Sequence, residues 1–392
     1  MPKTNPRLCL TMIVKNESAI IKRCLDSVKQ YIDYWVIFDT GSTDNTKEII
    51  KDYLGEAEIP GELHESEFVN FSHNRNEALN ASKDKADYLL LMDADLEFRV
   101  NKDSFKKTLA DLSADSYLVN ECDSIHEGNC SGFNYRNKKI VSSNRDWHYV
   151  GSTHEVIELK DSEDSTTDHS VNFDEVWFHN RYDGGSKADK FERDVRLLSK
   201  EIKDKPEDTR TMFYLAETYL NLFYRNKDNL QYLDNAIYWY EERSKRVDAW
   251  SQETYYSLFK LAKAKTERNK QFDFASYLKA YEFLPSRLEP IHEIVKYCRE
   301  NELYKIGYII GQSAIDNIKP LEDDALFVDG DVYSHKLVDE TSVCASWAGD
   351  NESACEMIES IIPIVEGYIS EENENRIKEN LKICRNLLQS KV

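Results

Sequence analysis

The sequence predicts a chain with two kinds of structure, an α/β domain followed by an all-α region. Short apolar runs alternate with segments of helical periodicity up to about residue 180, whereas only helical periodicity is found from about Lys187 onward. The chain has 392 residues, which is more than one ordinary hydrophobic core accommodates. We therefore expect an α/β domain at residues 1–185 and helical domains at residues 186–320 and 321–392.

The first part reads as strand, helix, strand, helix and strand. Apolar runs at 8–14, 35–39 and 88–92 predict buried strands, and residues 18–31 and 44–54 have the spacing of amphipathic helices. Continuous apolar strands that alternate with helices are typical of a parallel sheet covered on both faces. In such sheets ligands bind beyond the carboxyl ends of the strands. The polar residues that follow these strands are therefore the candidate site residues.

The second part contains helical stretches joined by short polar linkers. The stretches are 212–224, 233–243, 251–265, 272–284 and 290–300. They recur with a period of roughly 33 to 38 residues, with small residues at the expected helix contacts, which resembles tetratricopeptide repeats. Gly184-Gly185-Ser186 breaks the chain before the repeats begin, and residues 321–392 are expected to form a helical cap.

Composition excludes several classes of protein. The formal net charge of −21 disfavours non-specific binding to nucleic-acid backbones. The eight cysteines include no C-x-x-C pair, which favours reduced, buried thiols over a zinc site or a disulfide framework. No apolar segment approaches the roughly 18 residues expected of a membrane-spanning helix. We therefore expect a soluble, cytoplasmic protein without a membrane span.

Asp93-Ala94-Asp95 closes the apolar run 88–92. Two carboxylates two residues apart at a strand end can converge on one hard divalent cation, Mn²⁺ or Mg²⁺. In so acidic a chain, however, an isolated D-x-D is equally well explained as two solvated carboxylates. Its significance depends on the motifs around it.

Three further motifs precede Asp93-Ala94-Asp95 in order. They are Thr-Met-Ile-Val-Lys-Asn-Glu at 11–17, Ile-Phe-Asp-Thr-Gly-Ser-Thr-Asp-Asn-Thr at 37–46, and Phe-Ser-His-Asn-Arg-Asn at 71–76. The ordered set resembles the inverting family-two glycosyltransferases, which have the GT-A fold, a Rossmann-like nucleotide-diphospho-sugar transferase domain. It is most similar to members that carry tetratricopeptide repeats behind the catalytic domain. The resemblance covers residues 8–180.

This resemblance implies a UDP-sugar donor and roles for particular residues. Thr11 and Glu17 would lie at the end of the first strand, with Thr11 contacting the base. Asp39 would accept a hydrogen bond from the base or ribose; alternatively it caps the following turn, although Ser42 or Asp44 fits that task better. Gly41 is expected to have a positive φ.

The resemblance also assigns the donor diphosphate and its cation. Arg75 would reach the base or the diphosphate, unless it forms only a surface ion pair. Asp95 would be the direct metal ligand, and Asp93 would contact the ribose or a metal-bound water. Family members often continue this motif as D-x-D-E, whereas this chain has Leu96-Glu97, so no direct role is expected for Glu97.

A second cluster, Gly151-Ser152-Thr153-His154-Glu155, resembles the family's G-x-x-H-E segment. An inverting transfer needs a carboxylate that takes the proton of the acceptor hydroxyl. Glu155 is the candidate base, and Asp146 is a rival. His154 would orient the base or contact the diphosphate, or else it is a core histidine bonded to the backbone.

Two residues near the end of the first domain complete the expected site. His179 follows an apolar run at another strand end. The resemblance implies that a histidine at this place would be the third metal ligand. Lys187, with the preceding glycines, would close over the diphosphate; the alternative is a plain interdomain linker.

The sequence therefore predicts a metal-assisted inverting glycosyltransferase. It would move a sugar from a UDP-sugar to a glycan, a protein or another macromolecular acceptor. The alternative is an inactive GT-A fold that acts as an interaction scaffold through its helical repeats. The helical domain could also support a homo-oligomer.

Overall fold

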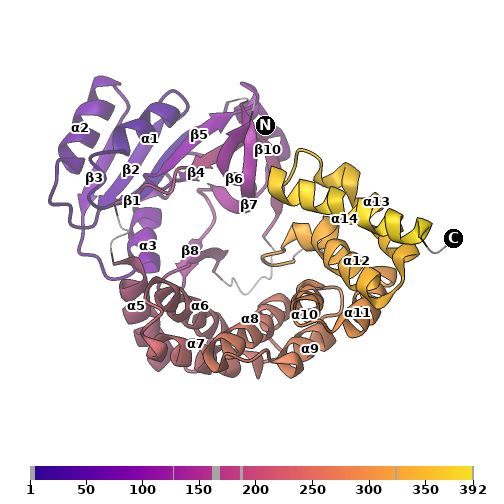
Figure 1. Ribbon diagram of the computed structural model, residues 1–392. Helices are drawn as coiled ribbons and strands as arrows, with labels where there is room; N and C mark the ends of the chain where they lie inside the picture. The colour runs from indigo at the N-terminus through magenta and orange to yellow at the C-terminus, as the bar shows by residue number, and fades with distance from the viewer. Residues whose placement is uncertain (1–4, 127, 161–167, 186–188, 323–324, 391–392) are drawn as a thin grey trace. The chain divides into compact units, whose positions relative to one another are not determined.

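The computed structural model describes residues 5–126, 128–160, 168–185, 189–322 and 325–390. They form two compact units, Met1–Asp204 and Lys205–Val392 (Figure 1). The sequence places the first boundary after residue 185 and a second after residue 320, whereas the structure divides after Asp204 and keeps the remainder as one unit. The first difference arises because helix α5 (Lys190–Asp204) buries Asp194 and Leu198 and is bonded to the α/β fold through Glu201.

The first unit is built on an eight-stranded sheet with the order β3-β2-β1-β4-β7-β6-β10-β5. Its strands are β1 (Leu8–Val14), β2 (Tyr34–Asp39), β3 (Gly61–Glu65), β4 (Tyr88–Leu91), β5 (Leu96–Val100), β6 (Ser116–His126), β7 (Asn129–Ser142) and β10 (Ser170–Asn180). A separate hairpin pairs β8 (Trp147–Val150) with β9 (Val156–Leu159). The three strands expected from the apolar runs are β1, β2 and β4.

The sheet is mixed, which differs from the parallel sheet that the sequence predicts. Strands β3, β2, β1 and β4 run parallel to one another. Strand β7 is antiparallel to both β4 and β6, and β5 is antiparallel to β10. The half of the sheet from β7 to β5 also contains one parallel pair, β6 with β10. It includes the long β6–β7 hairpin, whose residues are more polar than those of β1, β2 and β4.

Helices cover both faces of the parallel half because alternate residues of a strand point to opposite sides. The helices of this unit are α1 (Ile21–Val28), α2 (Thr46–Glu56), α3 (Phe71–Ser82), α4 (Phe105–Leu112) and α5. Leu8 and Leu10 of β1 belong to the core formed with α1, α2 and α4. Cys9 instead belongs to the core on the opposite face, with Ala78 and Leu79 of α3.

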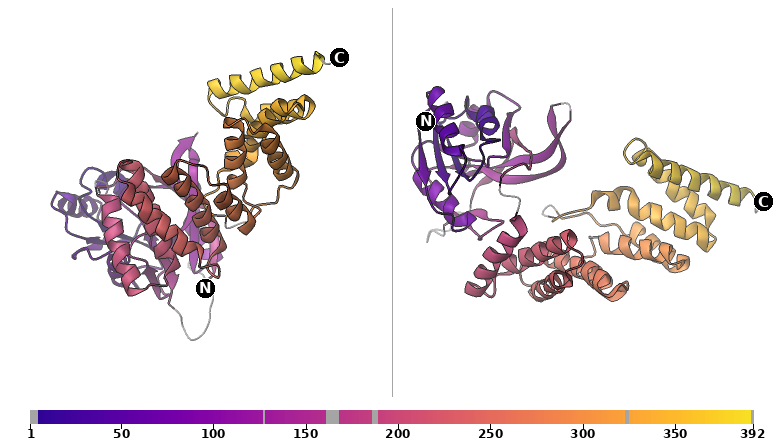
Figure 2. Two further views of the ribbon diagram at one scale, coloured as in Figure 1. Left: turned by 60° about the horizontal axis from the view of Figure 1, so that its bottom comes forward. Right: turned by 60° about the vertical axis from the view of Figure 1, so that its left-hand side comes forward.

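The second unit is helical throughout its described residues (Figures 1 and 2). Its helices are α6 (Thr209–Arg225), α7 (Leu230–Ser244), α8 (Ser251–Asn269), α9 (Phe274–Phe283), α10 (Glu289–Glu300), α11 (Tyr304–Asp316), α12 (Leu337–Ala348), α13 (Asn351–Val365) and α14 (Glu371–Gln389), with a π-helical turn at Val332–Lys336. Successive helices pack against one another, and small residues such as Ala216, Ala236 and Ala280 are fully buried between them. The predicted fold class, an α/β domain followed by an all-α tetratricopeptide-like domain, is confirmed. None of the described helices combines the length and apolarity that a membrane crossing requires.

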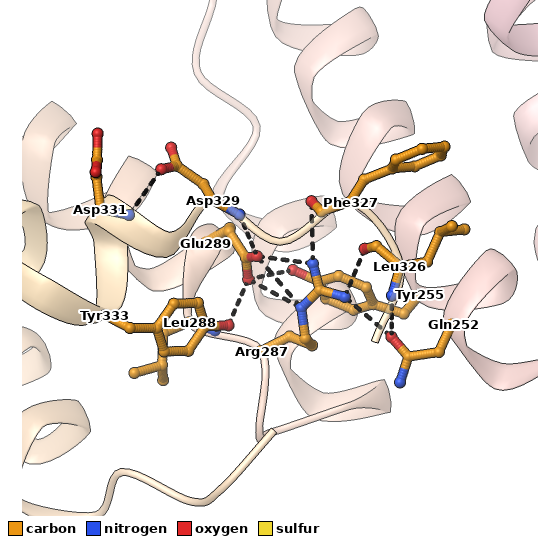
Figure 3. A network of polar contacts seen from close by, with 10 residues as sticks. All are labelled: Gln252, Tyr255, Arg287, Leu288, Glu289, Leu326, Phe327, Asp329, Asp331 and Tyr333. Carbon is orange, nitrogen blue, oxygen red and sulfur yellow. Dashed lines mark hydrogen bonds and ion pairs between the residues drawn. The ribbon is translucent and has the colours of Figure 1, made fainter. Parts of the chain in front are cut away.

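A buried polar network in the second unit is centred on Arg287 (Figure 3). Its guanidinium donates to Glu289 at 2.7 Å, to the side-chain oxygen of Gln252 at 2.9 Å and to the carbonyl of Leu326 at 2.9 Å. Tyr333 also donates to Glu289, at 2.9 Å. The network therefore ties the segment before the π-helical turn to helices α8 and α10.

Replacing Arg287 with methionine is expected to destabilise the second unit by about 3–5 kcal/mol, because Glu289 is left buried without its cation. Arg385→Met is the matched control, since Arg385 forms a largely exposed pair with Glu359 at 2.6 Å and should cost about 0–1 kcal/mol. The stability is measured by urea unfolding, and hydrogen exchange is used as the probe to show that the transition belongs to the second unit. Equal shifts in the two variants would show that the network adds little.

Candidate active site

Arg75 lies at the centre of the predicted site residues. Its Nε donates to Oε1 of Glu155 at 2.6 Å, and its Nη2 donates to Oδ1 of Asp93 at 2.6 Å. The guanidinium carbon also lies 5.6 Å from the centre of the Tyr149 ring. The Arg75 side chain is only 14% exposed. One arginine of α3 thus joins the carboxyl end of β4 to the β8–β9 hairpin.

The motif around Arg75 explains how α3 is held. Asn70 caps the helix by accepting from the His73 amide at 2.8 Å. Asn74 accepts from the Val69 amide at 3.0 Å. Asn76 accepts from the Tyr149 amide at 2.7 Å and donates to the Tyr149 carbonyl at 3.0 Å, which docks α3 on β8. The asparagines of this motif therefore orient the helix that presents Arg75.

Glu155 lies in the turn of the β8–β9 hairpin. Gly151 begins this turn with a φ of +94°, and a Cβ there would approach the Thr153 carbonyl to 3.4 Å. The Ser152 amide donates to Glu201 of α5 at 2.8 Å, so α5 anchors the turn. His154 is exposed and has a φ of +52°, so it is not the core histidine considered from the sequence. The rival base Asp146 precedes β8, at the other end of the hairpin, and pairs with Lys83 and Lys160 at 3.5 Å each.

Asp93 lies between two cations. Burial acts to raise its pKa, but the charges of Arg75 and Lys139 outweigh this and lower it. Lys139 is buried in a bulged part of β7, and its Nζ lies 3.0 Å from Oε2 of Glu121. Glu121 also accepts from Tyr135 at 2.7 Å and from Asn180 at 2.6 Å. Neither Lys139 nor Glu121 belongs to a motif that predicts the site, and the one signal in the sequence is a lysine directly before the apolar Ile140-Val141.

Asp95 and Glu17 flank Gly184. A Cβ on Gly184 would lie 3.3 Å from Oδ2 of Asp95 and 3.6 Å from Oε1 of Glu17. The Gly185 amide donates to Oε2 of Glu17 at 2.9 Å. Burial, and then the negative charge of Asp95 and other carboxylates, raises the pKa of Glu17 to about 7. A cation between these carboxylates would relieve this repulsion.

Asp39 is buried, and its two carboxylate oxygens differ in their hydrogen bonding. Oδ1 accepts from the amides of Gly41 at 3.0 Å and Ser42 at 2.8 Å, so Asp39 itself stabilises the turn. Asp44, which the sequence favoured for this task, also stabilises the turn by accepting from the Thr46 amide at 3.1 Å, and its other oxygen accepts from the Ser18 amide. Ser42 instead accepts from the Asn16 amide. Gly41 has the expected positive φ, +100°. Oδ2 of Asp39 is buried and accepts no hydrogen bond from any described residue.

Two predicted residues are not gathered with this cluster, and a third lies outside the described part of the chain. Thr11 lies inside β1, and its hydroxyl donates to Ser82 of α3 at 2.9 Å, so it is not at the strand end. His179 pairs across strands with Glu97, and burial followed by the charge of Arg181 lowers its pKa. Lys187 lies outside the described residues.

The expected metal-ligand set is therefore incomplete. In the part of the chain that the structure describes, no group of three or more His, Cys, Asp and Glu side chains is close enough to hold a metal ion. Asp93, Asp95 and His179 do not form such a group. A cation held by one or two carboxylates and by substrate phosphates does not require a third protein ligand, and Asp95 with Glu17 fits that simpler arrangement.

Comparison with known proteins finds a family match for most of the first unit. Residues 9–170 match the family model of Glycosyl transferase family 2. Residues 9–170 therefore match a family 2 glycosyltransferase domain, and the resemblance noted in the sequence is confirmed for this part of the chain.

Relatives of known name match parts of the chain. The SPbeta prophage-derived glycosyltransferase SunS of Bacillus subtilis (strain 168) is 25% identical over 240 residues, which are 59% of this chain and 53% of SunS. The chain thus spans about half the length of that relative. A TPR repeat-containing protein of Synechococcus elongatus is 37% identical over 91 residues, covering 23% of this chain and 21% of that protein.

Solved structures show only distant likeness. S. aureus TarS 1–349 in complex with UDP-GlcNAc is 16% identical with a TM-score of 0.36, over 83% of this chain and 95% of that one. MamA is 12% identical with a TM-score of 0.33, over 45% of this chain and 90% of that one. At such low TM-scores neither likeness adds to the assignment.

Proposed function

We propose that this protein is an inverting glycosyltransferase that uses a UDP-sugar, with the donor bound around Arg75, Asp93 and Asp95. The observation that carries the proposal is the pair of 2.6 Å bonds from Arg75 to Asp93 and to Glu155. A single guanidinium holds the aspartate of the D-x-D motif and the candidate base beside one another. A donor that contacts Asp93 would then lie on the same side of Arg75 as Glu155, the candidate base.

A divalent cation, Mg²⁺ or Mn²⁺, fits the carboxylates of Asp95 and Glu17. When bound, such a cation neutralises charge on the diphosphate that departs. Oδ2 of Asp39, a buried acceptor without a partner among the described residues, suits a hydrogen-bond donor on the base or ribose. His154, exposed on the hairpin turn, is proposed to contact the donor from the side of Glu155.

Glu155 is proposed as the general base. Arg75 engages its Oε1, which makes Oε2 the oxygen proposed to take the proton. The acceptor oxygen would attack the anomeric carbon, the bond from that carbon to the diphosphate oxygen would break, and the acceptor proton would pass to Oε2 of Glu155. UDP leaves with the electron pair of the broken bond. Attack from the face opposite the leaving group inverts the anomeric configuration.

The proposed acceptor is a glycan, a protein or another macromolecule. Stacked helical repeats present extended surfaces that suit long ligands, and the second unit is such a stack. The same surface could support self-association of the chain.

The donor assignment is tested by measuring nucleotide release from a panel of UDP- and GDP-sugars, with and without added acceptors. We expect release from at least one UDP-sugar. If no donor is turned over or bound, the inactive-scaffold alternative replaces the proposal.

The cation proposal predicts that excess EDTA lowers donor turnover by about 10²-fold or more, since metal stabilisation of a leaving group contributes several kcal/mol. Adding back Mn²⁺ or Mg²⁺ in excess over the chelator should restore the rate. Turnover that is unaffected by EDTA would exclude a required dissociable cation and leave Arg75 and Lys139 as the charges near the diphosphate.

A further inference from the structure

Glu97 has no expected role, yet it is the point on which three arginines converge. Its side chain is buried, and Oε1 accepts from Nε of Arg181 at 2.6 Å and lies 3.4 Å from Nε of Arg23. Arg99 pairs with the other oxygen. Glu97 is thus bound by arginines of α1, of β5 and of the segment that follows β10.

The segment 181–185 is attached to this carboxylate twice. Arg181 binds Glu97 directly. Asp183 binds Arg23 through two bonds of 2.8 Å and 2.7 Å, and Arg23 in turn lies beside Glu97. We name these four residues, Arg23, Glu97, Arg181 and Asp183, the Glu97 clamp. Bidentate and charge-assisted bonds of this kind fix position as well as adding energy.

The same segment contacts the carboxylates of the candidate cation site. The Arg181 amide donates to the Asp95 carbonyl at 3.1 Å. The Gly185 amide donates to Glu17, and Gly184 packs between Asp95 and Glu17 so closely that a Cβ would be 3.3 Å from Oδ2 of Asp95. The segment is therefore in contact with both carboxylates.

The backbone of the segment is itself unfavourable without external restraint. Tyr182 has a φ of +51°, a left-handed conformation that residues with a side chain rarely adopt. Its amide donates to the side chain of Asn180 at 2.8 Å. Such a conformation persists where the surrounding contacts over-determine it, and the clamp supplies those contacts.

We propose that Glu97 is a positioning residue of the donor site: through Arg181, Arg23 and Asp183 it holds segment 181–185 against Asp95 and Glu17. Segment 181–185 is then a wall of the site and not an interdomain linker. The part of this inference that concerns donor binding rests on the proposed function. The part that concerns the position of the segment does not.

The first test is hydrogen exchange of the full-length protein without ligand. Glu97→Gln keeps the shape of the side chain and removes its charge, so the amides of segment 181–185 should exchange about tenfold to hundredfold faster, as expected for lost charge-assisted bonds. Glu175→Gln is the matched control on the same sheet, because Glu175 of β10 pairs with the exposed Lys102 at 3.0 Å. Protection that is unchanged in Glu97→Gln, or equally lost in Glu175→Gln, would overturn the proposal.

Arg181→Met provides a second variant in case Glu97→Gln does not fold, because Arg181 is 45% exposed and its removal leaves Glu97 with two arginines. It should raise the exchange rates of the same amides, and combining it with Glu97→Gln should raise these rates little further. Additive effects of the two changes would contradict a shared clamp.

The second test uses donor kinetics. Both clamp variants should raise the donor KM about tenfold or more, by a larger factor than they lower kcat, and Glu175→Gln should leave both values unchanged. A freed segment with an unaltered donor KM would overturn its assignment as a wall of the donor site. A wild-type protein that turns over no donor would instead refute the proposed function, while the exchange experiment would still decide the clamp.

Discussion

Replacing Glu155 with glutamine is expected to lower sugar transfer by about 10²–10⁴-fold, the usual contribution of a positioned general base. The amide keeps the size of the side chain and can still accept from Arg75, but it cannot take the acceptor proton. Donor affinity, measured by calorimetric titration with a UDP-sugar, should therefore change little. The rate is measured as acceptor-dependent release of UDP.

Glu158→Gln is the matched control for this change, because Glu158 is an exposed glutamate of β9 in the same hairpin. It should transfer at the wild-type rate. Loss of donor binding in Glu155→Gln would place Glu155 in the donor subsite, and a comparable loss of transfer in Asp146→Asn would assign the base to Asp146 instead.

Replacing Arg75 with methionine is expected to be the most damaging single change in the first unit. It leaves Asp93 and Glu155 near one another without the cation that binds both. Breaking a buried pair costs about 3–5 kcal/mol, and the 38% exposure of the Asp93 side chain reduces this to about 2–4 kcal/mol. Unfolding of the first unit by urea, followed by hydrogen exchange, measures the loss.

The control for Arg75→Met is Arg136→Met, which removes a pair with Asp174 at 2.6 Å in which Asp174 is 72% exposed. That change should cost less than about 1 kcal/mol. Arg75→Met should also abolish detectable transfer, because the two carboxylates lose their common support. A variant of Arg75 that folds with wild-type stability and rate would show that this arginine is a surface contact only.

The parallel half of the first unit could be predicted because its strands carry continuous apolar runs, as in β1 and β4. The antiparallel strands β7 and β5 could not, since long-range pairing leaves no comparable local signal. Helix α5 clusters with the first unit, whereas the sequence places it after residue 185, because its attachment depends on long-range contacts such as the bond from the Ser152 amide to Glu201 and the packing of Arg193 over the Phe71 ring at 4.9 Å.

In the candidate site, too, some positions could be predicted from local motifs and others depend on long-range packing. Arg75, Asp93 and Glu155 are gathered as the order of the motifs implied. Thr11 is not, because strand alternation turns it towards α3 with Cys9.

Strand pairing across the sheet determines the positions of His179 and of the site residues that lie outside the motifs. His179 is opposite Glu97 through the register of β10 with β5. Lys139 and Glu121 reach the site through the β7 bulge and its partner strand, which no motif marks. Sequence motifs therefore located the ends of the parallel strands well, and the sheet register determined the remaining neighbours.

The most direct test of the central claim, that the Asp93–Asp95 end of the sheet binds and activates a nucleotide-sugar, is UDP release by wild-type protein and by Asp95→Asn. Asp52→Asn, an exposed change in α2, is the control. We predict metal-dependent release by the wild-type and control proteins, and loss of release by about 10²-fold or more in Asp95→Asn with both units still folded. Release by Asp95→Asn at the wild-type rate would contradict the account.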